Sequence, residues 1–246
     1  MEITEAVDAA QALVRERFPE AVAAFLGGSL ARGEGTDTSD LDVVVIRPAP
    51  AEVYRETLVW RGRPAEVFVH TPESVRTMFA WDRANGVPTM ASLCADSLVL
   101  RSVGGAAEQV ASWARDTLRA GPRPLSADAL ALRRYTVTDL RDDLLDCRDA
   151  DERLAVAALL HVAAGELLLA AVGAWSGKGK WLARRLRAAA PDLGGRLLAD
   201  YRALAAGGPA EPLGATVTAV LDLAGGPLLA GDRRTAGPSL LAGPAD

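Results

Sequence analysis

Residues 26–46 read LGGSLARGEGTDTSDLDVVVI, and this stretch decides how the N-terminal half of the chain folds. Its second part, LDVVVI at 41–46, is rich in branched residues and predicts a buried strand. Asp40 and Asp42 lie at the start of that strand. Side chains two residues apart on a strand point to the same face, so the two carboxylates lie side by side, with Cα atoms roughly 6.5 Å apart. They would repel each other and be costly to desolvate, so a divalent cation is their natural partner.

A glycine-serine turn precedes the acidic pair. Gly27 and Gly28 remove side chains where the chain leaves AVAAFLG at 21–27, an apolar run that predicts another strand. Ser29 adds a hydroxyl at a helix start, and such a turn offers backbone N–H groups to an anion. Arg32 follows one helical turn later and supplies the positive charge that a polyphosphate requires. The turn therefore predicts a phosphate-binding site next to the acidic pair.

A third carboxylate, Glu66, is expected on the strand PAEVFVH at 64–70, where it shares a face with Phe68 and His70. Ligation by oxygen alone favours Mg²⁺ or Mn²⁺ over Zn²⁺. Three carboxylates can hold two such ions about 3.5–4 Å apart, which activates an attacking oxygen and steadies the leaving one in an in-line phosphoryl displacement. We interpret His70 as a satisfied core or edge histidine; the alternative is an outer partner of the metal site.

The order strand, Gly-Ser turn, short helix and Ser-Asp-Leu-Asp on the next strand resembles the nucleotidyltransferase superfamily that includes DNA polymerase beta. The resemblance covers about residues 20–100. It implies a nucleoside triphosphate as co-substrate, phosphate contacts from Ser29 and Arg32, and a metal site made of the three carboxylates. An ordinary surface turn with capping aspartates is the alternative interpretation.

The fold class predicted is α+β, with a mixed sheet and flanking helices followed by a helical bundle. GPRP at 121–124 marks the boundary, because the pattern changes there from mixed to almost wholly helical. We predict a catalytic domain over 1–121, a helical substrate-binding domain over 122–228 and a loosely packed tail over 229–246. Periodicity and capping place strands at 21–27, 41–46, 64–70 and 97–102, and helices at 4–18, 72–84, 106–120, 126–147, 151–174, 179–189, 192–206 and 212–224.

A helical domain after such a core resembles the kanamycin, streptomycin and lincosamide nucleotidyltransferases, which attach AMP or another nucleoside monophosphate to an antibiotic hydroxyl. In that group a glutamate acts as general base. Glu166, in the most apolar helix of the chain, is our candidate, with a pKa raised by burial. A salt bridge to a neighbouring helix is the alternative role for Glu166, and Asp142 or Asp143 is the alternative base.

Two charged segments of the second half have both a functional and a structural interpretation. The stripe of Asp139, Asp142 and Asp146 either lines a cleft for a cationic acceptor such as an aminoglycoside or is a solvated helix face. Lys180, in GKGKWLARRL at 177–186, begins a helix where dipole and cations favour an anion, so it is our candidate for a further triphosphate contact. A basic solvated helix is the alternative.

Composition narrows the class of protein. The chain has 246 residues, half of them apolar, and a net charge of −5, which argues against a nucleic-acid partner bound through a broad basic surface. Cys94 and Cys147 lack the spacing of a zinc site or disulfide framework and fit a reducing compartment. The apolar run at 156–175 contains His161 and Glu166, so we expect a buried helix rather than a membrane span. The N-terminus lacks the pattern of a secretory signal, and we predict a cytoplasmic protein.

These observations predict a metal-dependent enzyme that transfers a nucleoside monophosphate, AMP by preference, from a nucleoside triphosphate to a hydroxyl of a small molecule, with an antibiotic such as an aminoglycoside as one acceptor class. Two alternatives remain: an antitoxin-like nucleotidyltransferase that AMPylates a protein, against which the fused helical domain speaks, and a nucleotide-binding module without catalysis. For the oligomeric state, both a monomer and a homodimer remain open.

Overall fold

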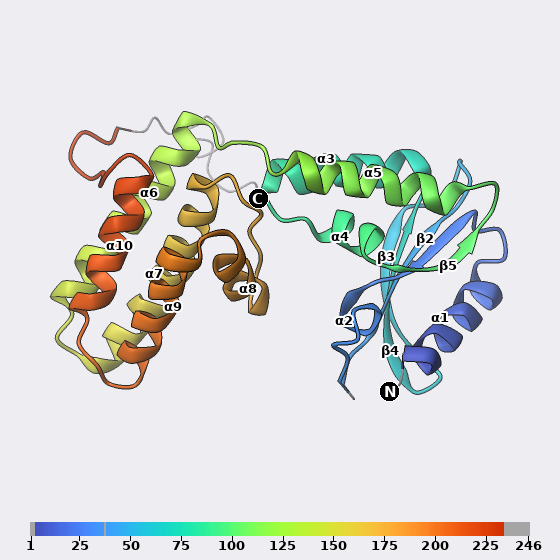
Figure 1. The fold of residues 1–246 in the computed structure, drawn as a ribbon, viewed down its shortest axis with the longest axis horizontal. Helices are drawn as coiled ribbons and strands as arrows, with labels where there is room; N and C mark the ends of the chain where they lie inside the picture. The colour runs from blue at the N-terminus through green and yellow to red at the C-terminus, as the bar shows by residue number, and fades with distance from the viewer. Residues whose placement is uncertain (1–2, 37, 234–246) are drawn as a thin grey trace, which may run out of the picture. The chain divides into compact units, whose positions relative to one another are not determined.

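The computed structural model describes residues 3–36 and 38–233 (Figure 1). The chain divides into two compact units, Met1–Arg123 and Pro124–Asp246, and each has a hydrophobic core of its own. From residue 234 onward, the tail predicted over 229–246 lies outside the described residues.

Unit 1 contains a mixed sheet that, in the described part of the chain, has five strands in the order β3-β4-β2-β1-β5. β2 and β4 are parallel, and the other neighbours are antiparallel. The α+β fold class is therefore confirmed. The strands are β1 (Ala23–Leu26), β2 (Leu41–Ile46), β3 (Tyr54–Trp60), β4 (Arg63–His70) and β5 (Leu98–Ser102).

Helices cover both faces of this sheet, which explains why β2 is apolar almost throughout (Figure 1). Val43 and Val45 pack in the cluster that includes α1 (Ile3–Arg17). Val44 and Ile46 face the opposite cluster, whose helices are α3 (Pro72–Asn85), α4 (Thr89–Ala95) and α5 (Ala106–Ala120). Side chains alternate along a strand, so the even-numbered Asp42 is on the face of the sheet covered by α3, α4 and α5.

Two elements of unit 1, β3 and α4, were not among those predicted from the sequence. β3 forms a hairpin with β4 through Arg61 and Gly62, which both have positive φ (49° and 82°). Positive φ at both central residues is the geometry of a type I′ turn, which matches the twist of a hairpin. The second missed element is α4, a helix of seven residues that begins directly after Pro88.

Unit 2 is helical throughout its ordered elements. Its longest helix, α7, packs fully buried leucines such as Leu160, Leu167 and Leu168 into the unit's core. By length and composition alone α7 could cross a membrane, but core helices of soluble proteins pass the same test, and the cytoplasmic location stays a prediction. The helices are α6 (Ala127–Asp146), α7 (Ala150–Ala171), α8 (Lys180–Ala189), α9 (Pro191–Ala205) and α10 (Glu211–Leu223).

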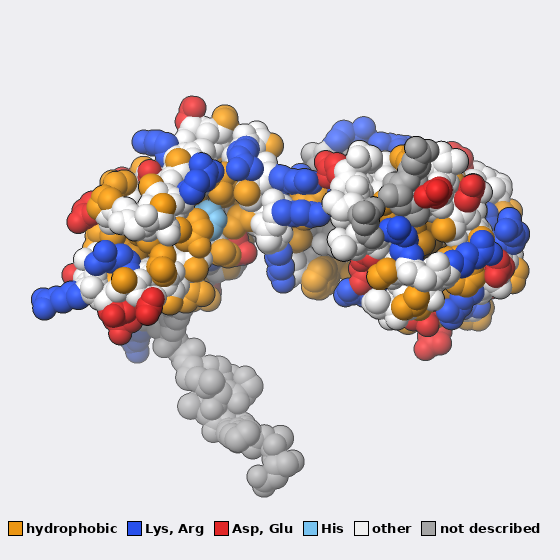
Figure 2. Space-filling view, turned by 90° about the horizontal axis from the view of Figure 1, so that it is seen from below, with side chains coloured by type: hydrophobic (Ala, Val, Ile, Leu, Met, Phe, Trp, Pro, Cys, Tyr) orange, Lys and Arg blue, Asp and Glu red, His pale blue; other side chains and the backbone are white. Residues whose placement is uncertain are grey.

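The surface of each unit carries a mixture of side-chain types. Figure 2 shows basic, acidic and apolar side chains intermixed on the visible face, rather than one continuous basic surface. A protein that holds a nucleic-acid backbone by charge needs clustered Lys and Arg. The absence of a nucleic-acid partner stays a prediction that agrees with this face.

Candidate functional site

The structure brings the three predicted carboxylates of unit 1 together. Asp42 on β2 and Glu66 on β4 are register partners across the parallel pair, and Asp40 immediately precedes β2. One carboxylate oxygen from each of the three residues lies within 4.8 Å of the others. Strand pairing therefore joins two parts of the sequence into one acidic cluster, which we call the acidic trio.

The acidic trio fits a divalent cation chemically. All three residues are half-buried, so the carboxylates lose part of their hydration while remaining open to an ion from solvent. The ligand atoms are all oxygens, as Mg²⁺ and Mn²⁺ prefer. Separations of up to 4.8 Å between ligand atoms are short enough for shared ions. Asp40, Asp42 and Glu66 are thus the residues of the described chain that could hold the metal.

At Gly27 and Gly28 the turn that follows β1 lies directly against Asp42 of the acidic trio. The backbone N–H of Gly27 donates to the carbonyl oxygen of Asp42 at 2.8 Å. Gly28 begins α2 (Gly28–Ala31) with a φ of 70°, and a Cβ atom there would lie only 1.7 Å from Asp42 Oδ2. Glycine is required at position 28 for two reasons, the backbone conformation and the space that the carboxylate takes.

A small hydrogen-bond network fixes the loop between α2 and β2. The Ser39 hydroxyl accepts from the Thr36 backbone N–H at 2.9 Å and from the Ser29 hydroxyl at 3.2 Å. Arg63, the first residue of β4, donates from Nη1 to the Ser39 carbonyl at 2.9 Å. Since Ser39 directly precedes Asp40, this network positions the first carboxylate and the predicted phosphate-binding serine at once.

Arg32, the other predicted phosphate contact, is the C-cap of α2. Its side chain is 27% exposed, and Nε lies 3.5 Å from Glu34 Oε2. The guanidinium is therefore held at the end of the helix whose first turn carries Gly28 and Ser29. A contact with phosphate from this position stays a prediction.

Arg55 is a neighbour of the acidic trio that the sequence analysis missed, because it lies on the missed strand β3. Its guanidinium forms an ion pair with Glu66 Oε1 and lies 5.5 Å from the ring centroid of Phe68. The alternation of YRETLVW at 54–60 and the Arg-Gly pair after it are the signals that could have placed this arginine.

His70 lies outside the acidic trio. It is at the far end of β4 from Glu66, and its Nδ1 is 3.1 Å from the Ser74 hydroxyl, within the capping box of α3. Burial lowers the pKa of His70, which favours the neutral ring. These contacts agree with the interpretation of a satisfied histidine.

Glu166 on α7 differs from the expectation of a buried acid. Its side chain is 37% exposed, and Oε2 lies 4.0 Å from Arg133 Nη1 on α6. The prediction of burial was wrong because α7 is apolar around its whole circumference, so the pattern does not show which face meets the core. The salt-bridge alternative agrees with the contact to Arg133.

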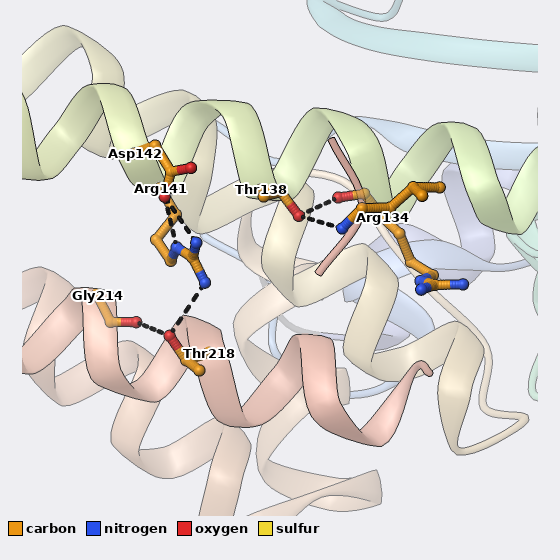
Figure 3. Close-up of polar contacts among 7 residues, drawn as sticks. Arg134, Thr138, Arg141, Asp142, Gly214 and Thr218 are labelled. Carbon is orange, nitrogen blue, oxygen red and sulfur yellow. Dashed lines mark hydrogen bonds and ion pairs between the residues drawn. The ribbon is translucent and has the colours of Figure 1, made fainter. Parts of the chain in front are cut away.

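The alternative bases have different surroundings. Asp142 Oδ1 accepts from Nε and Nη2 of the adjacent Arg141 at 2.9 and 2.6 Å, and Arg141 also donates to Thr218 on α10 (Figure 3). Asp143 instead lines an open hollow of about 610 Å³ together with Asp146, Cys147, Arg148, Glu152, Ala155 and Val156. Of the aspartate stripe, Asp142 is therefore in an ion pair, whereas Asp146 lines a hollow with several acids.

Lys180 is the first residue of α8, and its side chain is exposed. Trp181 follows, with the guanidinium carbons of Arg184 and Arg185 at 5.0 and 5.5 Å from its ring. The start of α8 is thus positively charged, as the sequence indicates. A contact between Lys180 and a triphosphate stays a prediction.

A protein-family model matches part of the N-terminal unit. The family model of the nucleotidyltransferase domain matches residues 10–78, which include the glycine-serine turn and the whole acidic trio. Residues 10–78 thus match a nucleotidyltransferase domain, and the predicted resemblance is confirmed for this part of the chain. Among solved structures, the chain is similar to a nucleotidyltransferase-like protein from Exiguobacterium sibiricum 255-15, with 14% sequence identity, a TM-score of 0.47, and coverage of 89% of this chain and 74% of that one. No curated protein matches the sequence.

Proposed function

We propose that this protein is a metal-dependent nucleotidyltransferase that moves a nucleoside monophosphate, AMP by preference, from a nucleoside triphosphate to a hydroxyl of a small molecule and releases pyrophosphate. The observation that carries the proposal is the acidic trio beside the turn at Gly28, within the residues that match the nucleotidyltransferase domain. Carboxylates from β2, from the residue before it and from β4 meet there beside the turn after β1, an arrangement suited to metal-assisted transfer of a phosphoryl group.

Each part of the site has a role in this proposal. Asp40, Asp42 and Glu66 hold one or two Mg²⁺ ions, which supply charge stabilisation at the reacting phosphate and a lower pKa for the attacking hydroxyl. Gly28 and Ser29 bind the phosphate oxygens through backbone N–H and hydroxyl groups. Arg32 neutralises phosphate charge from the end of α2. Lys180 is the proposed further contact to the triphosphate.

The acceptor is proposed to be a cationic small molecule with a free hydroxyl, such as an aminoglycoside. The hollow lined by Asp143, Asp146 and Glu152 supports a cationic ligand, because three acids outnumber its one arginine, Arg148. Glu166 is the proposed general base, which takes the proton of the attacking hydroxyl. Asp143 remains the alternative, whereas Asp142 is held by Arg141.

Pyrophosphate release tests the reaction. The full chain is incubated with Mg²⁺, each of the common nucleoside triphosphates in turn, and a panel of aminoglycosides and lincosamides. We expect release with at least one combination and its loss in Asp42→Asn. Glu56→Gln is the control, because Glu56 is an acid of β3 that pairs with Arg17 on the opposite face of the sheet. Turnover that survives in Asp42→Asn would contradict the metal site.

Analysis of the products of the same incubation, with labelled nucleotide, separates the alternatives. Labelled nucleotide attached to a protein partner, with no modified small molecule, would favour the antitoxin-like AMPylating enzyme. Binding of Mg²⁺ and nucleotide without any product in the presence of both acceptor classes would favour the non-catalytic module. Turnover with an acceptor outside the antibiotic panel would support the proposed reaction and contradict an antibiotic as the acceptor.

A further inference from the structure

Arg55 is a basic group that lies directly against the acidic trio, through its ion pair with Glu66. It points to the same sheet face as Glu66, because its register partner on β4 is Phe68, two residues beyond Glu66. The guanidinium lies over the Phe68 ring and pairs with Glu66 Oε1. The carboxylate of Glu66 therefore has both the guanidinium of Arg55 and the carboxylates of the two aspartates as neighbours.

The exposure of the two partners differs greatly. The Glu66 side chain is 16% exposed, whereas the Arg55 side chain is 65% exposed. Glu66 is the more buried partner and has less room to move, whereas the more exposed arginine can leave with most of its hydration already in place. When a cation approaches, the arginine is thus the partner that yields.

The charges of Arg55 and of a metal ion oppose each other at this carboxylate. Without a cation, Arg55 offsets part of the repulsion among three carboxylates within 4.8 Å. A cation that binds an oxygen of Glu66 comes close to the guanidinium, and the two positive charges repel each other. The stabilisation that Arg55 gives the metal-free site is then lost. The arginine therefore stabilises the metal-free site and weakens the binding of the metal.

We propose that Arg55 is a positioning residue that competes with the metal ion for Glu66 and so sets the metal affinity of the site. This inference rests on the metal site of the proposed function and deepens it. The arginine keeps Glu66 oriented on the face of the acidic trio while no metal is bound, and it gives way when the ion arrives.

Mn²⁺ binding to the full chain, followed by electron paramagnetic resonance of the free ion, tests the competition without any turnover. In Arg55→Met the guanidinium is lost while an unbranched apolar side chain is kept. We expect Mn²⁺ to bind on the order of tenfold more tightly, as expected for the loss of one positive charge near a divalent ion. Arg55→Lys keeps the charge, so its affinity should remain close to that of the unmodified protein.

Arg17→Met is the matched control. Arg17 pairs with Glu56, which neighbours Arg55 on β3 and points to the other sheet face, so this variant removes the same charge from the opposite side. Its Mn²⁺ affinity should not change.

The outcomes separate the inference from the proposed function. Mn²⁺ affinity in Arg55→Met that is equal to or below that of the unmodified protein overturns the role of Arg55. If in that case the unmodified protein binds Mn²⁺ and Asp42→Asn does not, the metal site stands and only the inference on Arg55 fails. If neither the unmodified protein nor any variant binds Mn²⁺, both the metal site and the inference fail.

Discussion

Gly28 and Asp42 are so close that a Cβ atom on the glycine would lie 1.7 Å from Oδ2 of the aspartate. Gly28→Ala should therefore displace the carboxylate and abolish both Mn²⁺ binding and turnover. The φ of 70° adds a backbone cost, so the free energy of unfolding should fall by more than the roughly 1 kcal/mol expected for alanine in a left-handed conformation. Urea unfolding and metal titration on the same sample measure the two effects.

Gly33 provides the control for this substitution. It has the same φ of 70°, but a Cβ atom there would meet no described atom within 4 Å. Gly33→Ala should lose about 1 kcal/mol of stability and keep its metal binding. Equal loss of metal binding in both variants would contradict the steric role of Gly28.

Ser39 should connect stability to the geometry of the site. Ser39→Ala removes the acceptor of the Thr36 backbone N–H and the contact with Ser29, so we expect about 1–2 kcal/mol less stability and weaker nucleotide binding. Thr38→Ala, which removes an exposed hydroxyl 3.2 Å from that of Thr36, should change stability by less than about 0.5 kcal/mol. Chemical denaturation and nucleotide titration check both variants. Unchanged nucleotide binding in Ser39→Ala would contradict its role.

Asp82 should make stability depend on pH. Burial raises its pKa from 3.8 to about 6, although Oδ2 accepts a hydrogen bond from the Ala91 N–H, 2.8 Å away, at the start of α4. Among the described residues its Oδ1 is buried without a partner. Between these two pKa values the folded protein holds the proton and the unfolded chain releases it, so this group's contribution to stability falls as pH rises from about 4 to about 6.

Asp82→Asn tests this assignment because asparagine has a similar shape and no charge. The difference in unfolding free energy between variant and unmodified protein should increase in favour of the variant from pH 4 to pH 6 and then level off. Denaturant unfolding at half-unit pH steps measures the difference. A constant difference across that range would show that Asp82 does not titrate there.

Glu166 has two proposed roles that a pair of variants can separate. If Glu166 is the general base, Glu166→Gln should lower kcat by about 10²- to 10⁴-fold. Arg133→Met, which removes only its ion-pair partner, should keep turnover and change stability by less than about 1 kcal/mol, since both side chains are more than a third exposed. Similar turnover in the two variants would leave Glu166 with the structural role alone.

The acidic trio could be predicted from the sequence because each of its strands has a clear pattern. LDVVVI and PAEVFVH are apolar on the faces that meet the core, and the position of an acid in such a strand fixes the direction of its side chain. From α7 onward the helices of unit 2 were equally predictable, since glycine or proline separates them.

The elements that were missed have weaker signals for physical reasons. β3 is an edge strand whose residues alternate between half-buried and exposed, so its apolar pattern is faint, and Arg55 was missed with it. α4 is too short for a helical period to emerge. The orientation of Glu166 was not predictable because α7 is apolar on all its faces, so the pattern does not show which face packs against the core.

The parallel pairing of β2 with β4 makes the acidic trio a product of long-range closure, since the chain between these strands includes all of β3. A chain in which the two strands have not yet met holds two carboxylates at most, and its hold on an ion is correspondingly weak. A luminescent lanthanide bound in place of Mg²⁺ would therefore report, during refolding, the time at which the centre of the sheet is completed.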